Sequence, residues 1–294
     1  MSAARSSWAR QRGERKAREL GYTAFPIDPF EIARGEEIEL WPKKPDQVGV
    51  SGGIVFNGDD TAIFYSTDIK SLGFQRFTVA HELGHYFLEG HPAAIIKIGP
   101  LHASRAGFTE GNISIEIEAD HFASGLLLPT TLVRAKLSDA MIGLEGIEEL
   151  AEVSLCSLTA SAIRAAECSP YPMAIVVSRG NEVRYAFMSD GFKRLGKLSF
   201  LRRGDALPNS LTRHFNADGN NVVSGKRACE EVDLQTWFGG ARSITLDEQV
   251  IGLGSYGFTL TVLSSDDLTD DPDEDEDEEA LLIESYTPKF AYGR

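Results

Sequence analysis

The sequence predicts an α+β fold, with a mainly helical N-terminal region that includes a small sheet and a mixed, β-rich C-terminal region. Apolar residues recur at helical spacing over 74–89 and 115–128, and short alternating runs bounded by turn residues occur within 37–65 and again within 170–265. We divide the chain at these changes of pattern. The segments are 1–135, a helical segment 136–169, 170–265 and a tail 266–294.

The first segment begins with a predicted helix over 7–20, and a second short helix follows Pro29 over 30–33. Residues 37–41, 52–56 and 61–65 alternate as strands do, and the last two strands flank the turn Asn57-Gly58-Asp59-Asp60. These strands predict a small sheet just before the next helix.

Residues 74–89 predict a long helix, because Gly90 and Pro92 supply its first strong stop signal. Gly84 lies inside this helix, where it costs about 1 kcal/mol relative to Ala. We therefore expect another backbone to cross close to Gly84.

The same helix carries His81-Glu82-Leu83-Gly84-His85. Histidines at positions i and i+4 project from one face of a helix, so both imidazoles can bind one Zn²⁺ ion. Glu82 then lies beside the metal, where its carboxylate can take a proton from the attacking water. The alternative is a surface helix with two ordinary histidines.

A third ligand is expected on a helix over 115–128, which Pro129 ends. Glu118 borders its apolar stripe, in line with Ile115 and Phe122, so the pattern favours Glu118 over Glu116. Glu116 shares a face with Asp120 and is expected to be solvated. Asp120 and His121 are candidates for outer partners of a ligand histidine, but an exposed helix face is the preferred interpretation of both.

Residues 91–110 are expected to form a loop that contains His91 and His102. Either histidine could donate to the oxyanion of a tetrahedral intermediate. Ordinary loop histidines are the simpler interpretation, so that role stays unassigned, as it does for Tyr65 and Tyr86.

Over about 170 residues the chain resembles the ImmA/IrrE metallopeptidases. The resemblance rests on three stretches, 25–33, 76–85 and 118–129. It implies a zincin-like metallopeptidase domain over 1–135, with the Glu that opens the last stretch, Glu118, as the third ligand. Family members usually have Asn where Asp120 or His121 stands. The resemblance further implies a protein substrate, namely a DNA-binding repressor of the helix-turn-helix (XRE) type, in a stress-response or mobile-element switch.

Residues 136–169 resemble a helix-turn-helix, with helices over 145–153 and 157–166. Arg164 is the only basic residue among four glutamates in 145–166, although a recognition helix must neutralise phosphates. Packing is therefore the favoured role, and direct nucleic-acid binding is not expected.

The segment 170–265 predicts two β-hairpins, one over 173–188 and one over 248–263. It stands where some relatives carry a ligand-sensing module, so a regulatory or docking domain is expected. Phe215, Trp237 and Phe238 could line a pocket, but aromatic core is the preferred interpretation.

Eleven acidic residues and no Lys or Arg lie in 266–279, so most of the net charge of −15 belongs to the tail, which we expect to be disordered with a short apolar end. Its alternative role is to compete for a basic DNA-binding surface. Three cysteines without CxxC spacing, no secretory signal and no apolar run of about 18 residues predict a cytoplasmic protein that does not enter a membrane.

The sequence therefore predicts a zinc-type endopeptidase with His81, His85 and Glu118 as ligands and Glu82 as general base. Mn²⁺ or Fe²⁺ would also suit this ligand set. One rival is a non-catalytic metal-binding regulator that acts by protein contact, and the other is a DNA-binding transcription regulator. The sequence leaves the oligomeric state open.

Overall fold

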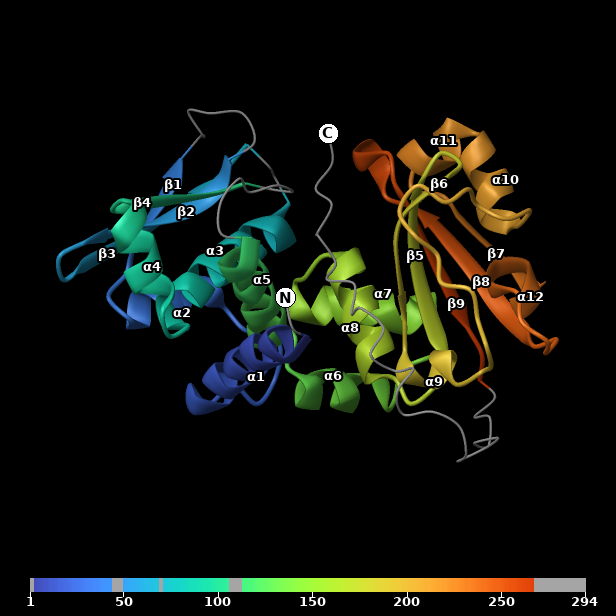
Figure 1. Cartoon of the computed structure of the whole chain (residues 1–294), viewed down its shortest axis with the longest axis horizontal. Coiled ribbons are helices and arrows are strands. Elements are labelled where there is room, and N and C mark those ends of the chain that lie inside the picture. The colour runs from blue at the N-terminus through green and yellow to red at the C-terminus, as the bar shows by residue number, and fades with distance from the viewer. Residues whose placement is uncertain (1–2, 44–49, 69–70, 106–112, 267–294) are drawn as a thin grey trace. The chain divides into compact units, whose positions relative to one another are not determined.

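The computed structural model describes residues 3–43, 50–68, 71–105 and 113–266, and their elements are drawn in Figure 1. They form two compact units, each described by itself below. The first comprises residues up to 133 together with 151–160, and the second comprises 134–150 together with 161–266. The predicted acidic tail lies outside the described residues from 267 onward.

The first unit contains a four-stranded sheet in the order β1-β3-β2-β4. The strands expected at 52–56 and 61–65 are confirmed as β2 and β3, and Gly58 in the turn between them has a φ of +63°. β1 pairs in parallel with β3, whereas the other neighbours are antiparallel. The strand bounds are β1 Glu39–Lys43, β2 Val50–Asn57, β3 Asp60–Ser66 and β4 Leu101–Arg105.

Six helices accompany this sheet, and their order and lengths agree with most of the sequence-based expectations. α3 is capped by Ser71, whose hydroxyl accepts a hydrogen bond from the Phe74 amide at 3.3 Å. The helices are α1 Ala3–Glu19, α2 Pro29–Gly35, α3 Leu72–Phe87, α4 His91–Ile98, α5 Ile113–Leu127 and α6 Thr130–Leu137.

The loop expected over 91–110 is wrong for most of its length, because α4 and β4 occupy 91–98 and 101–105. Pro92 lies in the first turn of α4, where a missing backbone N–H leaves no helical hydrogen bond unmade. The proline therefore starts this helix instead of marking a loop.

Helix α5 packs against both α1 and α3, and all three lie side by side in Figure 1. A Cβ atom on Gly84 would lie 3.0 Å from the Ala119 Cα, so the backbone crossing expected at Gly84 is present and is made by α5. On α1, a Cβ atom on Gly13 would lie 2.1 Å from the Phe122 carbonyl oxygen. Conversely, one on Gly125 would lie 2.2 Å from the Arg10 carbonyl oxygen.

The close approach of α1 and α5 at Gly13 allows a prediction about the free energy of unfolding. In Gly13→Ala the gain in helix propensity is about 1 kcal/mol, but the added methyl must push α5 away, and overpacking of this kind costs about 1–3 kcal/mol. We expect a lower free energy of unfolding, measured by urea titration. Gly35→Ala is the control, because a Cβ atom there meets nothing within 4 Å. Equal stability of the two variants would show that α1 does not fix α5.

The helix-turn-helix-like pattern corresponds to α7 Leu144–Ser154 and α8 Leu158–Cys168. Leu155 at the turn has a positive φ of 56°, and the Ser157 hydroxyl accepts a hydrogen bond from the Ala160 amide. Arg164 is buried and forms an ion pair with Glu167. Its guanidinium is therefore not available to a nucleic-acid phosphate.

The second unit contains a five-stranded, fully antiparallel sheet in the order β6-β5-β9-β8-β7. Both hairpins expected from the sequence are confirmed, as β5 with β6 and β8 with β9. Besides the parts of α6, α7 and α8 that belong to this unit, its described residues form four short helices and a 3₁₀ turn. The bounds are β5 Met173–Arg179, β6 Glu182–Met188, α9 Asp190–Lys193, α10 Leu211–Ala217, α11 Gly219–Val223, β7 Arg227–Asp233, α12 Leu234–Phe238, β8 Thr245–Gly252, η1 Gly254–Tyr256 and β9 Thr259–Ser264.

Phe215, Trp237 and Phe238 are buried in the core of this unit, as preferred from the sequence. Glu248 is fully buried beside them, and its carboxylate accepts hydrogen bonds from Trp237 Nε1 at 3.1 Å and from the Thr212 amide at 2.7 Å. The Thr212 hydroxyl donates a further bond of 2.6 Å. These donors offset the cost of burying a carboxylate, so Glu248 is an internal structural group. Within the described parts of the chain, no helix is both long and apolar enough to cross a membrane.

Candidate metal centre

The centre is built on α3, where His81 and His85 are one helical turn apart. Both are buried, with 7% and 0% of the residue exposed, and their Nε2 atoms lie 3.1 Å from each other. Their rings meet edge to face with centroids 4.9 Å apart. The two nitrogens therefore converge on one point beside the helix, as the i, i+4 spacing predicts.

Glu116 on α5 supplies a carboxylate at the same point. Its Oε2 lies 3.3 Å from His81 Nε2 and its Oε1 lies 3.4 Å from His85 Nε2. Ligand atoms bound tetrahedrally at about 2.0–2.1 Å are about 3.3 Å from one another. Each of the three separations is close to this value, although the two contacts of Glu116 are made by different oxygens. One ligand atom from each of His81, His85 and Glu116 lies within 4.8 Å of the others, so the three residues could hold a zinc-type ion with one position left open.

This geometry corrects the preference for Glu118 as third ligand. The Glu118 carboxylate accepts two hydrogen bonds of 2.8 Å from Arg5 and lies 3.3 Å from His91 Nε2. Residues 116 and 118 differ by about 200° around a helix. They therefore face opposite sides of α5, and it is the Glu116 side that meets α3.

The preference for an exposed helix face at Asp120 over a role as outer partner of a histidine is wrong for the same reason. Asp120 is one turn after Glu116 and shares its face, and its Oδ1 accepts a hydrogen bond of 2.8 Å from His81 Nδ1. This contact leaves the Nε2 lone pair of His81 directed at the centre, because a histidine that donates from Nδ1 is a ligand through Nε2. Two i, i+4 pairs, His81/His85 and Glu116/Asp120, thus face each other across the two helices.

Glu82 is fully buried, and both of its carboxylate oxygens lack a hydrogen-bond partner in the structure. Ser104 and His102 come from β4, where residues two apart point to one face. Their Oγ and Nε2 atoms are likewise buried without a hydrogen bond, although His102 Nε2 lies 2.7 Å from Glu116 Oε1. Buried polar atoms of this kind need a partner. Their convergence is what a centre that receives an ion and a water molecule requires.

Burial and neighbouring charged groups shift the pKa values of Glu82, His85 and Glu116 in different directions. Burial raises the pKa of Glu82 to about 7, against the opposing effect of His81. Burial also lowers the pKa of His85 to about 3, only partly offset by its contact with Glu116. For Glu116, burial would raise the pKa, but the close contacts of its carboxylate with His102, His81 and His85 outweigh this effect and lower the pKa. A neutral His85 and an ionised Glu116 are the states in which these residues bind metal.

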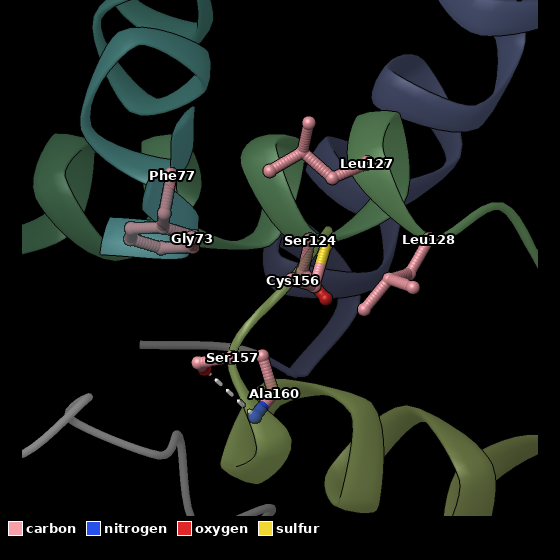
Figure 2. Close-up of a pocket in the computed structure, with 8 residues that line it drawn as sticks. All are labelled: Gly73, Phe77, Ser124, Leu127, Leu128, Cys156, Ser157 and Ala160. Carbon is pink, nitrogen blue, oxygen red and sulfur yellow. Dashed lines mark hydrogen bonds between the residues drawn. The ribbon is translucent and has the colours of Figure 1, made fainter. Parts of the chain in front are cut away.

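A separate, mostly apolar pocket in the first unit lies between α3, the end of α5 and the turn before α8 (Figure 2). Its only titratable group is the thiol of Cys156, whose pKa burial raises to about 11. Such a thiol is a poor nucleophile at neutral pH. The pocket therefore offers no chemistry to rival the metal centre. Its lining residues are Gly73, Phe77, Ser124, Leu127, Leu128, Cys156, Ser157 and Ala160.

Comparison with known proteins identifies the segment that holds the centre. Residues 49–160 match the peptidase M78 family model, described as the IrrE N-terminal-like domain. This match supports the resemblance to the ImmA/IrrE family over that segment and the reading of it as a metallopeptidase domain. No curated protein matches the chain.

Among solved structures the chain is similar to a transcriptional regulator from Mycobacterium tuberculosis. The likeness has a TM-score of 0.52 at 15% identity and covers 87% of this chain and 76% of the other. At that identity it speaks for the fold alone. α1, α2 and β1 lie before the segment that matches the family model.

Proposed function

We propose that the protein is a metal-dependent endopeptidase whose ion is held by His81, His85 and Glu116 and whose general base is Glu82. The observation that carries the proposal is the convergence of two imidazole nitrogens, 3.1 Å apart, with the Glu116 carboxylate, whose Oε2 and Oε1 lie 3.3 Å from His81 Nε2 and 3.4 Å from His85 Nε2. The buried carboxylate of Glu82, which has no hydrogen-bond partner in the structure, belongs to the residue that follows His81. The match of residues 49–160 to a peptidase family supports it independently.

A bound Zn²⁺ ion would polarise the scissile carbonyl and lower the pKa of a water molecule at the open position. Glu82 accepts the proton of the attacking water and later delivers it to the leaving amine. His102 faces the centre from β4 and is the better candidate for the oxyanion donor, because His91 hydrogen-bonds to His85 and Glu118.

For the substrate, we propose a DNA-binding repressor of the helix-turn-helix type. The support is the resemblance of residues 49–160 to the IrrE N-terminal-like domain. Direct DNA binding by this chain is the weaker alternative, since Arg164 is buried against Glu167 and α7 is acidic. A non-catalytic sensor would have no use for the carboxylate of Glu82.

Metal removal tests the proposed activity. The purified protein is incubated with each helix-turn-helix repressor encoded beside it, and the products are analysed by mass spectrometry. We expect one discrete cut that disappears after dialysis against a chelator and returns with added Zn²⁺. Mn²⁺ and Fe²⁺ are added in parallel to rank the metals. Cleavage that survives complete removal of the metal would contradict the proposal, and metal binding without any cleavage would favour the sensor.

A further inference from the structure

A chain of hydrogen bonds leads from His85 to the N-terminal helix. His85 Nδ1 lies 3.2 Å from His91 Nδ1, and His91 Nε2 lies 3.3 Å from Glu118 Oε2. Arg5 on α1 in turn donates two hydrogen bonds of 2.8 Å to the Glu118 carboxylate, from Nε and Nη2. His85 and Glu118 are fully buried and His91 is 1% exposed, whereas the Arg5 side chain is 56% exposed.

The donor and acceptor of every link follow from the role of His85. A ligand that binds through Nε2 keeps its proton on Nδ1, so His85 donates to His91 Nδ1. His91 then has its own proton on Nε2 and donates it to Glu118. The Glu118 carboxylate accepts from both His91 and Arg5. No atom in this series of hydrogen bonds has to donate and accept at once, so one assignment of protons satisfies every link.

The two ligand histidines are therefore oriented in different ways. His81 donates directly to a carboxylate, that of Asp120, at 2.8 Å. His85 reaches its carboxylate only through His91, and that carboxylate is fixed by a residue 113 positions earlier in the chain. Arg5 lies outside the segment that matches the peptidase family.

We propose that His91, Glu118 and Arg5 are positioning residues that hold His85 in the tautomer and orientation needed for metal binding. This inference rests on the proposed function and extends the metal centre to α1. The backbone contacts at Gly13 and Gly125 and the hydrogen bonds from Thr130 to Glu14 hold α1 in place, so that Arg5 meets Glu118.

The first test measures zinc affinity of the full-length protein by competition with a chromophoric chelator. We expect His91→Leu to weaken zinc binding by about 10–100-fold, as loss of an outer partner of a metal ligand does. His91→Asn has an amide oxygen close to where Nδ1 stands, so it can still accept from His85 and should recover part of the affinity. The thermal unfolding of the metal-free variants is recorded alongside, to separate loss of the partner from loss of the fold.

The second test uses Arg5, the exposed residue at the end of this series of hydrogen bonds. Arg5→Ala is expected to weaken zinc binding in the wild-type background but to have no further effect in His91→Leu, because the link to His85 is already cut. Arg15→Ala is the matched control, since it removes an exposed ion pair with Glu19 from the same helix and should change nothing. A residue that merely stabilised the fold would give additive losses in both backgrounds.

The outcomes separate this inference from the proposed function. If the wild type binds zinc through Glu116 while His91→Leu binds equally well, or if the Arg5 and His91 effects are additive, the positioning chain is refuted and the peptidase proposal stands. If the wild type binds no zinc, both are refuted.

Discussion

Glu82→Gln is expected to abolish peptide hydrolysis while leaving metal binding unchanged. The amide is nearly isosteric with the carboxylate but cannot take a proton from water. Because general-base catalysis contributes about 10²–10⁴-fold, the loss of kcat should be of that order or larger. Cleavage of the repressor and bound metal are measured on the same preparation.

The control for this prediction is Glu89→Gln, the same chemical change at an exposed position just after α3. It should retain full activity. A fully active Glu82→Gln protein would remove Glu82 as the base, and a protein that lost its metal would make Glu82 a ligand.

Glu116→Ala is expected to release the metal, because it removes one of the three ligand atoms. The loss of zinc affinity should exceed the about 10–100-fold typical of outer partners, and therefore should exceed that of Glu118→Ala and Asp120→Ala. Chelator competition on the three proteins ranks them directly. Retention of metal by Glu116→Ala together with its loss from Glu118→Ala would restore Glu118 as the ligand.

The helical part of the site could be predicted from the sequence because its signals are local. The i, i+4 spacing of His81 and His85 places them on one face of the helix. Gly84 inside the helix indicated a close backbone crossing, which α5 makes at Ala119. Both C-terminal hairpins were predicted from alternation and turn residues for the same reason.

The proximity of Glu116 to the two histidines could not be predicted in this way, because the apolar stripe of a helix does not say which neighbouring helix lies on which side. α5 is covered by α1 on one face and by α3 on another. Glu118 borders the stripe on the side of α1, where Arg5 forms an ion pair with it. Glu116 lies on the side covered by α3, and the sequence of α5 alone does not reveal that cover. The spacing of Glu116 and Asp120, which equals that of His81 and His85, is a local signal for the pair of carboxylates that lies closest to the two histidines.

The contacts of Arg5 and Gly13 with α5 also bear on the nascent protein. During synthesis the ribosome releases α1 first and α3, with both histidines, next, while Glu116, Asp120 and Glu118 are still to be made. Until α5 has been made and has packed against α1 and α3, the nascent chain has His81 and His85 but not Glu116, the proposed third ligand. The proposed metal site can therefore form only after α5 has been synthesised and has packed against α3.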